Sequence, residues 1–268
     1  ELAKLRAQLG LDRPLYEQFF SWLWGVMRLD FGKSLWTGAP ILEEIMIRLP
    51  LTLEVAIIAT IISTIIAIPL GTLAAIRQDT WVDYVMRVVS IGGIAIPGFW
   101  TGILIILFLV IYFEWGPPLE YASIFEDPWE NFKQLVWPIV SVGYRGAAVA
   151  ARMTRSTVLE TMREDYIRPA WAKGLQERVV VVKHALKNSF LPVLTIIGTE
   201  IAFLIGGLVV TETVFTLNGL GRFMVDAIAR RDIPVVQTMV LLIACSFVFV
   251  NLFVDLLYAW FDPRISYR

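Results

Sequence analysis

The chain contains long apolar segments, among them residues 51–76 and 235–260, which are interrupted by few charged side chains. A helix needs about 20 mostly apolar residues to cross the hydrocarbon core of a bilayer. Backbone groups in that core must be hydrogen-bonded within the protein, which favours helices over irregular structure. The chain is 57% hydrophobic and 18% charged, whereas about a quarter of the residues in soluble domains are charged. The sequence therefore predicts an all-α integral membrane protein.

Five spans are expected, and the second is interrupted at Pro97 and Gly98, where a helix can break if neighbouring groups satisfy the freed backbone. Residues 114–133, between the second and third spans, are acidic and rich in proline. Residues 1–50 are polar and aromatic, and their tryptophans are typical of a membrane interface. The predicted spans are residues 51–76, 88–113, 135–157, 190–210 and 235–260.

The composition argues against several kinds of function. The single cysteine, Cys245, lies in an apolar segment, so no internal disulfide is expected. The single histidine, His184, argues against most metal sites. The sequence lacks a phosphate loop of the GxxxxGK[ST] type, and its net charge of −1 gives no reason to expect nucleic-acid binding. We therefore expect no catalytic residues, no metal site and no cofactor in this chain.

Residues 164–192 form a polar, basic connection between the third and fourth spans, although a few residues suffice to join two helices. A helical run at 165–173 is expected to stop at Gly174, since glycine adopts the left-handed conformation that closes a helix. A second run at 176–188 leads back to the membrane, and Pro192 is expected in the first turn of the fourth span. A short helix on the membrane surface between two spans indicates a docking surface for a soluble partner.

Several short motifs in and around this connection are distinctive. They are Arg152-Met153-Thr154-Arg155-Ser156, Leu159-Glu160, Glu164-Asp165-Tyr166-Ile167-Arg168, Ala170, Ala172-Lys173-Gly174-Leu175, His184-Ala185-Leu186, Asn188, Leu191-Pro192, Thr211-Glu212-Thr213-Val214-Phe215, Gly219-Leu220-Gly221-Arg222 and Asn251-Leu252-Phe253-Val254-Asp255-Leu256-Leu257-Tyr258. Together they resemble importer-type ABC permeases, in particular the dipeptide/oligopeptide branch, over essentially the whole chain. The chain departs from the family at Pro169, where Thr is usual, so the short helix must start late or kink.

The resemblance implies a type I ABC importer transmembrane fold and a permease subunit. Such a subunit forms half of the translocation path for di- or oligopeptides that an external binding protein delivers. The implied partners are a second homologous permease and two cytoplasmic ATPase subunits, which bind the ATP and Mg. The implied location is the bacterial or archaeal plasma (inner) membrane.

The same resemblance suggests how the chain is divided. The family usually has six spans, and the first is missing here. Residues 1–50 would then be an external segment that follows the missing span. Residues 51–268 would be the transmembrane permease domain, with a cytoplasmic coupling loop at 158–190.

The resemblance also assigns candidate coupling residues to the short helix that would enter a cleft of one ATPase. They are Glu164, Asp165, Tyr166, Ile167, Arg168, Ala170, Trp171, Lys173 and Gly174. The acidic pair would favour the positive N-terminus of the helix, and the four apolar and aromatic residues would pack against the ATPase. The two basic residues would pair with acidic groups of the partner, or are ordinary cytoplasmic-side charges. The glycine would give the chain a sharp exit.

Charged side chains within spans are costly and usually face a bundle interior or water. The candidates for a translocation path or gate are Glu54, Arg145, Glu200 and Glu212. Arg145 would line the path and meet a peptide carboxylate or Glu200, or else form an ion pair that joins two helices. Glu212 would shape an external gate.

The orientation and the rival functions complete the prediction. Lys and Arg gather on the connections on the same side as the coupling loop, which predicts that this loop and the C-terminus are cytoplasmic.

One alternative function keeps the fold and changes the cargo to a nickel chelate, glutathione or an oligosaccharide. Another is an ion-driven secondary transporter with Arg145, Glu200 and Asp255 as a relay. A membrane-embedded hydrolase is disfavoured because no set of nucleophile, base and orienting residue stands out.

Overall fold

A computed structural model of the chain describes residues 12–117 and 121–261, and its named elements are all helices. In chain order they are α2 (Leu15–Met27), α3 (Ile41–Ile76), α4 (Trp81–Ala95), α5 (Gly98–Phe113), α6 (Pro128–Met162), the 3-10 helix η1 (Asp165–Ile167), α7 (Arg168–Ala172), α8 (Glu177–Val179), the π-helix η2 (Val180–Ala185), α9 (Leu186–Gly207), α10 (Val209–Val214), α11 (Leu220–Ala229) and α12 (Ile233–Phe261). Residues 1–11 of the predicted external segment and the last residues of the permease domain lie outside the described ranges.

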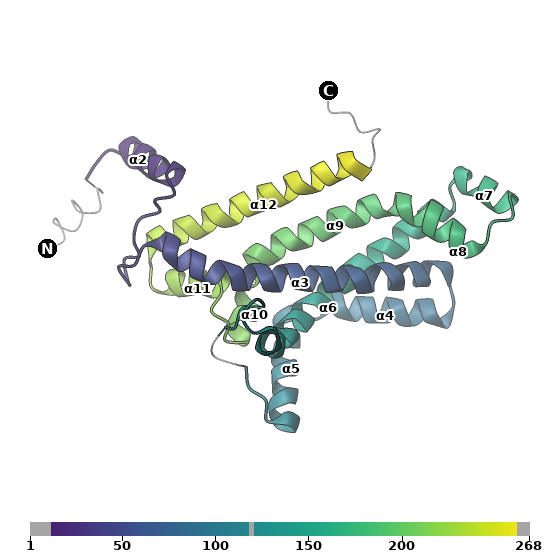
Figure 1. Cartoon of the computed structure of the whole chain (residues 1–268), viewed down its shortest axis with the longest axis horizontal. Coiled ribbons are helices and arrows are strands. Elements are labelled where there is room, and N and C mark those ends of the chain that lie inside the picture. The colour runs from purple at the N-terminus through teal and green to yellow at the C-terminus, as the bar shows by residue number, and fades with distance from the viewer. Residues whose placement is uncertain (1–11, 118–120, 262–268) are drawn as a thin grey trace.

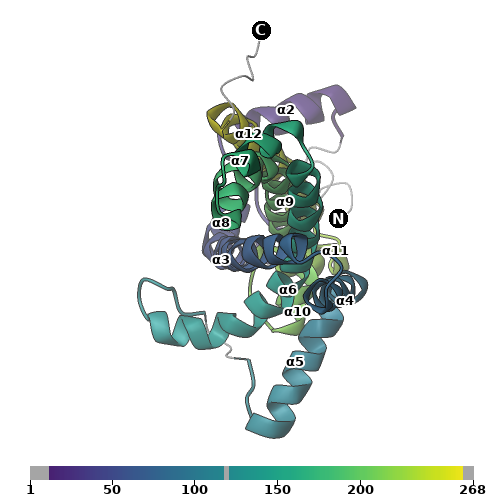
Figure 2. The same ribbon diagram turned by 90° about the vertical axis from the view of Figure 1, so that its right-hand side faces the viewer.

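The long helices α3, α6, α9 and α12 run along the long axis of an elongated bundle, and α4 lies beside α3 and α6 (Figure 1). The connection with α7 and α8 is at one end, which we call the α7 end. α2 and α11 are at the opposite end, the α11 end. α5 and the start of α6 project away from the bundle (Figure 2).

The helices are suited to a membrane to different degrees. Within the described ranges, three helical segments are long and apolar enough to cross it: Ile41–Ile76, Glu177–Gly206 and Ile233–Trp260. The bent pair α4–α5 makes a fourth if it is counted as one span. The predicted count of five therefore depends on α6, which has 35 residues but is less apolar because it carries six Lys, Arg and Glu side chains inside its bounds.

The second predicted span is two helices rather than one. α4 begins at Trp81, before the expected residue 88, and the axes of α4 and α5 differ by 98°. The cause is Pro97, which pushes the preceding Ile96 into an extended conformation (φ −84°, ψ 123°) and ends α4. The Ser141 hydroxyl of α6 donates a hydrogen bond of 3.1 Å to the Gly98 carbonyl, which holds the start of α5 against α6.

α3 starts ten residues earlier than the predicted span, because residues 41–50 have an apolar face of their own. Ile41 and Ile45 are almost fully buried in a cluster with Leu220 of α11 and Met239 of α12. The helix thus begins before the span that was predicted to start at residue 51. The first turns of α3 join the N-terminal segment to the bundle.

The fourth predicted span is also longer, since α8, η2 and α9 follow one another without a break from Glu177 to Gly207. Pro192 lies inside α9 and not in its first turn. The helix extends because Val180 and Ala185 bury their side chains against the loop that precedes them.

The centre of the bundle is built from small residues that bring α3 and α6 close together. The Ser63 hydroxyl of α3 donates to the carbonyl of Ala59 at 2.6 Å and to that of Gly143 on α6 at 2.8 Å. Gly71 of α3 faces the Ala151 carbonyl, and a Cβ at this position would come within 2.5 Å of that oxygen. Small residues at helix interfaces allow this kind of close packing in membranes.

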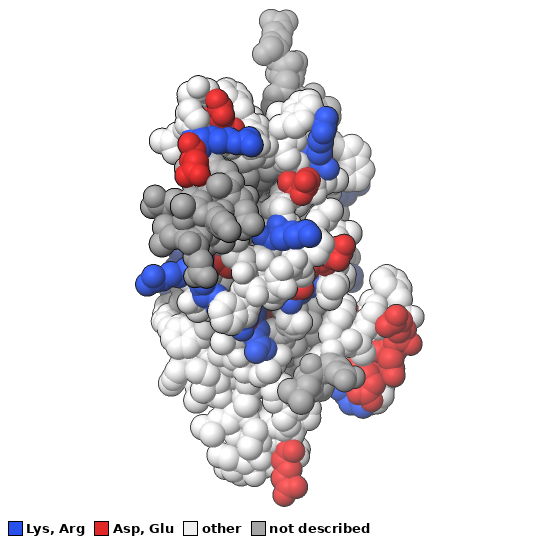
Figure 3. All heavy atoms as spheres, turned by 90° about the vertical axis from the view of Figure 1, so that its left-hand side faces the viewer, with Lys and Arg blue, Asp and Glu red and all other residues white. Residues whose placement is uncertain are grey.

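In the view from the α11 end, acidic side chains gather on the projecting start of α6 (Figure 3). Glu126, Asp127 and Glu130 are exposed there. Asp127 caps α6, since its carboxylate accepts hydrogen bonds from the Trp129 and Glu130 backbone N–H groups. The acidic character expected of residues 114–133 is thus present on the described part of this surface.

Candidate functional site

The predicted coupling helix, Glu164–Gly174, is built from two short pieces. Asp165–Ile167 form one 3-10 turn, and Arg168–Ala172 continue as α7. Pro169 falls in the first turn of α7, where its missing N–H costs little, so the helix starts late as the proline requires. Gly174 has a φ of +72°, which confirms the expected left-handed exit. We call Glu164–Gly174 the coupling motif.

Two of the predicted contact residues lie on the inner face of this motif. Ile167 is 1% and Ala170 is 6% exposed, and both pack against Val180 and Ala185 of η2. In this structure both side chains therefore face η2 of the same chain. The sequence could not separate the two faces, because a turn of 3-10 helix changes the periodicity within so short a segment.

The outer face carries the remaining side chains. Tyr166 is 44% and Trp171 is 43% exposed. Arg168 and Lys173 are also exposed, and Arg168 lies 3.3 Å from the Asp165 carboxylate in an ion pair open to solvent. Such pairs contribute little to stability. Glu164 is exposed just before the motif begins to turn.

The motif is held to the bundle by polar contacts. The Tyr166 hydroxyl accepts a hydrogen bond of 2.7 Å from the Asn188 amide and donates one of 3.4 Å to the His184 carbonyl. The Ser189 hydroxyl is 2.9 Å from the Thr161 hydroxyl, which connects α9 to α6. The connection thus folds back on itself instead of forming an open loop.

Of the predicted path residues, Arg145 and Glu200 come from facing helices but form no ion pair among the described residues. The Arg145 guanidinium lies over the Phe203 ring of α9, 5.4 Å from its centroid. Glu200 lines a small hollow of about 10 Å³ between α3, α6 and α9, together with Thr60 and Ser63. A hollow of this size has room for about one water molecule.

Glu54 lies farther toward the α11 end and belongs to a different cluster. Its carboxylate accepts a hydrogen bond of 2.5 Å from the Tyr121 hydroxyl, while its second oxygen is buried without a described partner. Burial, followed by the nearby Glu54 carboxylate, raises the pKa of Tyr121. The contact holds the connection after α5 against α3.

Glu212 does not line an opening, because its side chain is 1% exposed. Its carboxylate accepts hydrogen bonds of 2.8 Å from the Thr52 hydroxyl and 2.9 Å from the Arg222 N–H. The Leu220 N–H in turn donates to the Thr52 hydroxyl at 2.9 Å. Burial raises the pKa of Glu212, which lies beyond the apolar spans. Glu212 therefore fixes the turn before α11 onto α3.

Two polar clusters were not expected from the sequence. Asp83, with a side chain fully shielded from solvent, binds the Arg155 guanidinium of α6 through contacts of 2.6 and 2.8 Å. Asp232 accepts a hydrogen bond of 2.5 Å from Ser34, which anchors the N-terminal segment at the α11 end. A signal for the first cluster was present, since Arg155 belongs to one of the quoted motifs, but its partner lies far away in the sequence.

Two solved structures share this architecture. A chain of the MetNI methionine ABC transporter in an inward-facing form matches with a TM-score of 0.60 and 17% identity, over 79% of this chain and 93% of that one. A chain of an amino acid ABC transporter crystallised with histidines matches with a TM-score of 0.54 and 14% identity, over 80% and 91%. At such low identity these matches establish the fold alone.

Residues 67–267 match the family of binding-protein-dependent transport system inner membrane components. The chain belongs to this family. A probable peptide ABC transporter permease protein of Sinorhizobium fredii is 41% identical over 99% of this chain and 85% of that protein. The dipeptide transport system permease protein DppB of Escherichia coli is 39% identical over the same shares. A putative peptide transport system permease protein of Brucella suis is 38% identical over 98% and 84%.

Membership of this permease family settles several predictions. The all-α fold of ABC importer membrane subunits and the location in a membrane are confirmed. The permease is a membrane component of a transport system, as the resemblance implied.

Proposed function

We propose that this permease is one of two membrane subunits of an ATP-driven importer for di- or oligopeptides. It would form half of the translocation path together with a second homologous permease. An external binding protein would deliver the peptide, and two cytoplasmic ATPases would bind and hydrolyse the ATP. The peptide cargo is supported by similarity to peptide and dipeptide permeases over nearly the whole chain.

The observation that carries the proposal is the two-faced coupling motif. Its inner face packs against η2 through Ile167 and Ala170, while Tyr166 and Trp171 remain about 44% exposed on the outer face. Large aromatic side chains on a surface are typical anchors for another protein. Because the inner face is fixed to the helix that continues as α9, a movement of a docked partner would be transmitted to the bundle.

We assign a role to each part of the motif on this basis. Trp171 and Tyr166 fill the cleft of an ATPase, and Arg168 and Lys173 meet acidic groups at its rim. Glu164 and Asp165 lie at the positive start of the motif, and Gly174 turns the chain toward α8. Ile167 and Ala170 support the motif from inside.

Transport requires the permease to alternate between states that open to either side. An ATPase pair can shift that equilibrium only if it binds one state more tightly than the other. The hollow beside Glu200 is too small for a peptide, so the path would open when the two permeases move apart. Arg145 and Glu200, on facing helices, would then become accessible to the charged ends of a peptide.

The cargo is tested by uptake in the cells that produce the permease. Deletion of its gene is expected to abolish accumulation of a labelled dipeptide, and the intact gene should restore it. A variant with Trp171→Glu should restore the protein in the membrane but not the uptake. Normal dipeptide uptake in the deletion strain, with loss of a nickel chelate, glutathione or an oligosaccharide instead, would refute the peptide assignment.

A further inference from the structure

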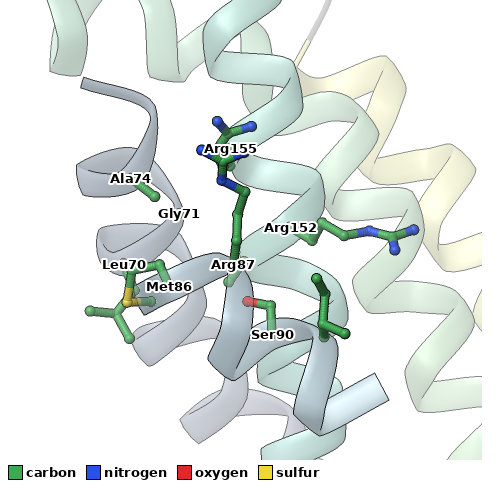
Figure 4. Close-up of a pocket in the computed structure, with 10 residues that line it drawn as sticks. Leu70, Gly71, Ala74, Met86, Arg87, Ser90, Arg152 and Arg155 are labelled. Atoms are coloured by element: carbon green, nitrogen blue, oxygen red, sulfur yellow. The ribbon is translucent and has the colours of Figure 1, made fainter. Parts of the chain in front are cut away.

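The space between α3, α4 and α6 has no role in the proposed transport cycle. A pocket of about 240 Å³ opens there, toward the end at which α3 passes into α4 (Figure 4). Leu70 of α3 and Met86 of α4 form apolar walls, and Arg87, Arg152 and Arg155 contribute the charged lining. The pocket therefore combines a cationic side with an apolar side.

The charges around the pocket do not cancel. Asp83 lies 2.9 Å from Arg87 and 2.6 Å from Arg155, and Asp79 lies 3.5 Å from Arg87. Arg152 extends from α6 on its own (Figure 4) and has no ion pair among the described residues. Arg87 and Arg155 thus share two carboxylates, and Arg152, which is exposed and extends away from both, adds one positive charge at the edge of the pocket.

One donor in this cluster lacks an acceptor. The Nε–H of Arg87 is buried and has no hydrogen-bond partner in the described part of the chain. A buried donor without a partner is unfavourable, and an anion in the pocket would satisfy it. The unpaired donor, the surplus charge and the cavity all favour the same kind of ligand.

We propose that this pocket binds the phosphate group of an anionic membrane lipid. The free Nε–H of Arg87 and the exposed guanidinium group of Arg152, once it turns toward the pocket, hold the phosphate, since arginine matches the geometry of phosphate oxygens. The apolar walls formed by Leu70 and Met86 accommodate the glycerol and the first part of an acyl chain. Basic pockets between membrane helices on the cytoplasmic side are suited to lipid headgroups, and the distribution of Lys and Arg predicts that side here.

Free inorganic phosphate could also bind to these arginines. The apolar walls distinguish it from the phosphate group of a lipid. A small inorganic ion would use the arginines alone and leave the walls exposed. A lipid uses both parts and reaches the pocket from within the membrane. Binding should therefore depend on the lipid headgroup and should resist competition from inorganic phosphate.

Native mass spectrometry of the purified, delipidated full chain tests the proposal, with phosphatidylglycerol and phosphatidylcholine as probes. One phosphatidylglycerol molecule should bind in preference to phosphatidylcholine. Arg152→Gln should weaken this binding about fivefold, because a basic residue near an anionic surface contributes about 1 kcal/mol. Arg87→Lys should also weaken it, since lysine keeps the charge and the ion pair but lacks the Nε–H. Arg163→Gln serves as the control and should bind phosphatidylglycerol normally, because Arg163 is exposed at the end of α6, away from the pocket lining.

Three outcomes would overturn the assignment. The first is equal binding of the two lipids, and the second is binding that is unchanged in Arg152→Gln and Arg87→Lys. The third is displacement of phosphatidylglycerol by an excess of inorganic phosphate, which would identify a free anion as the ligand. None of these measurements involves peptide transport, so they remain informative whatever the cargo is.

Discussion

Asp83, at the start of α4, is fully shielded from solvent and accepts two hydrogen bonds, of 2.6 and 2.8 Å, from the guanidinium group of Arg155 on α6. The two residues are 72 positions apart, and their contact fixes the first turn of α4 to α6, at the opposite end of α4 from the bend at Pro97. A neighbouring arginine, Arg87, lies 2.9 Å from the same carboxylate. One carboxylate thus joins two arginines from α4 and α6 at the start of α4.

Asp83→Asn should destabilise the permease, because it leaves two guanidinium groups without their counter-charge. Removal of one partner from a deeply buried pair costs about 3–5 kcal/mol. Asp83 is shielded from solvent but its partner Arg155 is 21% exposed, so the pair as a whole is not deeply buried. We therefore expect about 2 kcal/mol, measured as a lower melting temperature in detergent. Asp79→Asn is the control, since Asp79 is 66% exposed, and it should have almost no effect. Equal melting temperatures for the two variants would contradict this role.

Gly174→Ala should loosen the coupling motif without creating a clash. A Cβ at this position would meet nothing within 4 Å, so the cost arises only from the φ of +72°. That conformation costs a residue other than glycine about 1–2 kcal/mol. Hydrogen exchange of residues 164–175 should become faster as a result.

The matched control for this change is Gly98→Ala. Gly98 also has open space around its Cβ position, but its φ is not in the left-handed region. Exchange in the coupling motif should be unaltered in this variant. Unchanged exchange in Gly174→Ala would show that the left-handed exit is not required.

Glu212 should make the stability of the permease dependent on pH. Burial raises the pKa of this carboxyl in the folded state above its value in the unfolded chain. The stability it contributes is therefore present at low pH and is lost as the pH rises through the folded-state pKa. The melting temperature of the wild type should accordingly fall relative to that of Glu212→Gln as the pH is raised.

A series of melting curves for both proteins from acidic to neutral pH measures this effect. Glu43→Gln, at an exposed position in the first turn of α3, provides the reference for a change at the surface. If the difference in melting temperature between the wild type and Glu212→Gln is the same at every pH, burial does not raise the pKa of Glu212 in the folded state.

The sequence predicted the elements better than their boundaries. The apolar segments identified the helices, and Gly174 and Pro169 identified how the coupling motif ends and begins. The start of α3 was missed because Ile41 and Ile45 lie in a polar stretch and become apolar contacts only against α11 and α12. Pro97 signalled a break, but the bend of 98° depends on α6, which lies beside it only after folding.

In the candidate site, too, local sequence patterns located the residues but not the contacts that they make after folding. The motif residues were located by resemblance, but their division into an inner and an outer face depends on η2, which follows the motif in the chain. Glu212 was predicted to shape a gate because it is charged and near a span, but its hydrogen bonds to Thr52 and to the Arg222 N–H become apparent only in the structure. Asp83 and Arg155 form a pair that no local pattern connects.

The most direct test of the account is whether ATPase subunits remain bound when the permease is purified gently from its own membrane. Trp171→Glu places a charge on the outer face of the coupling motif and leaves Ile167 and Ala170 in place. Trp81→Glu is the control, since Trp81 is 75% exposed at the same end of the bundle. We predict that the wild type and Trp81→Glu retain two ATPases, whereas Trp171→Glu loses them, with binding weaker by about 30-fold for a central aromatic anchor. Retention of the ATPases by Trp171→Glu, or their absence from the wild type, would contradict the proposed coupling.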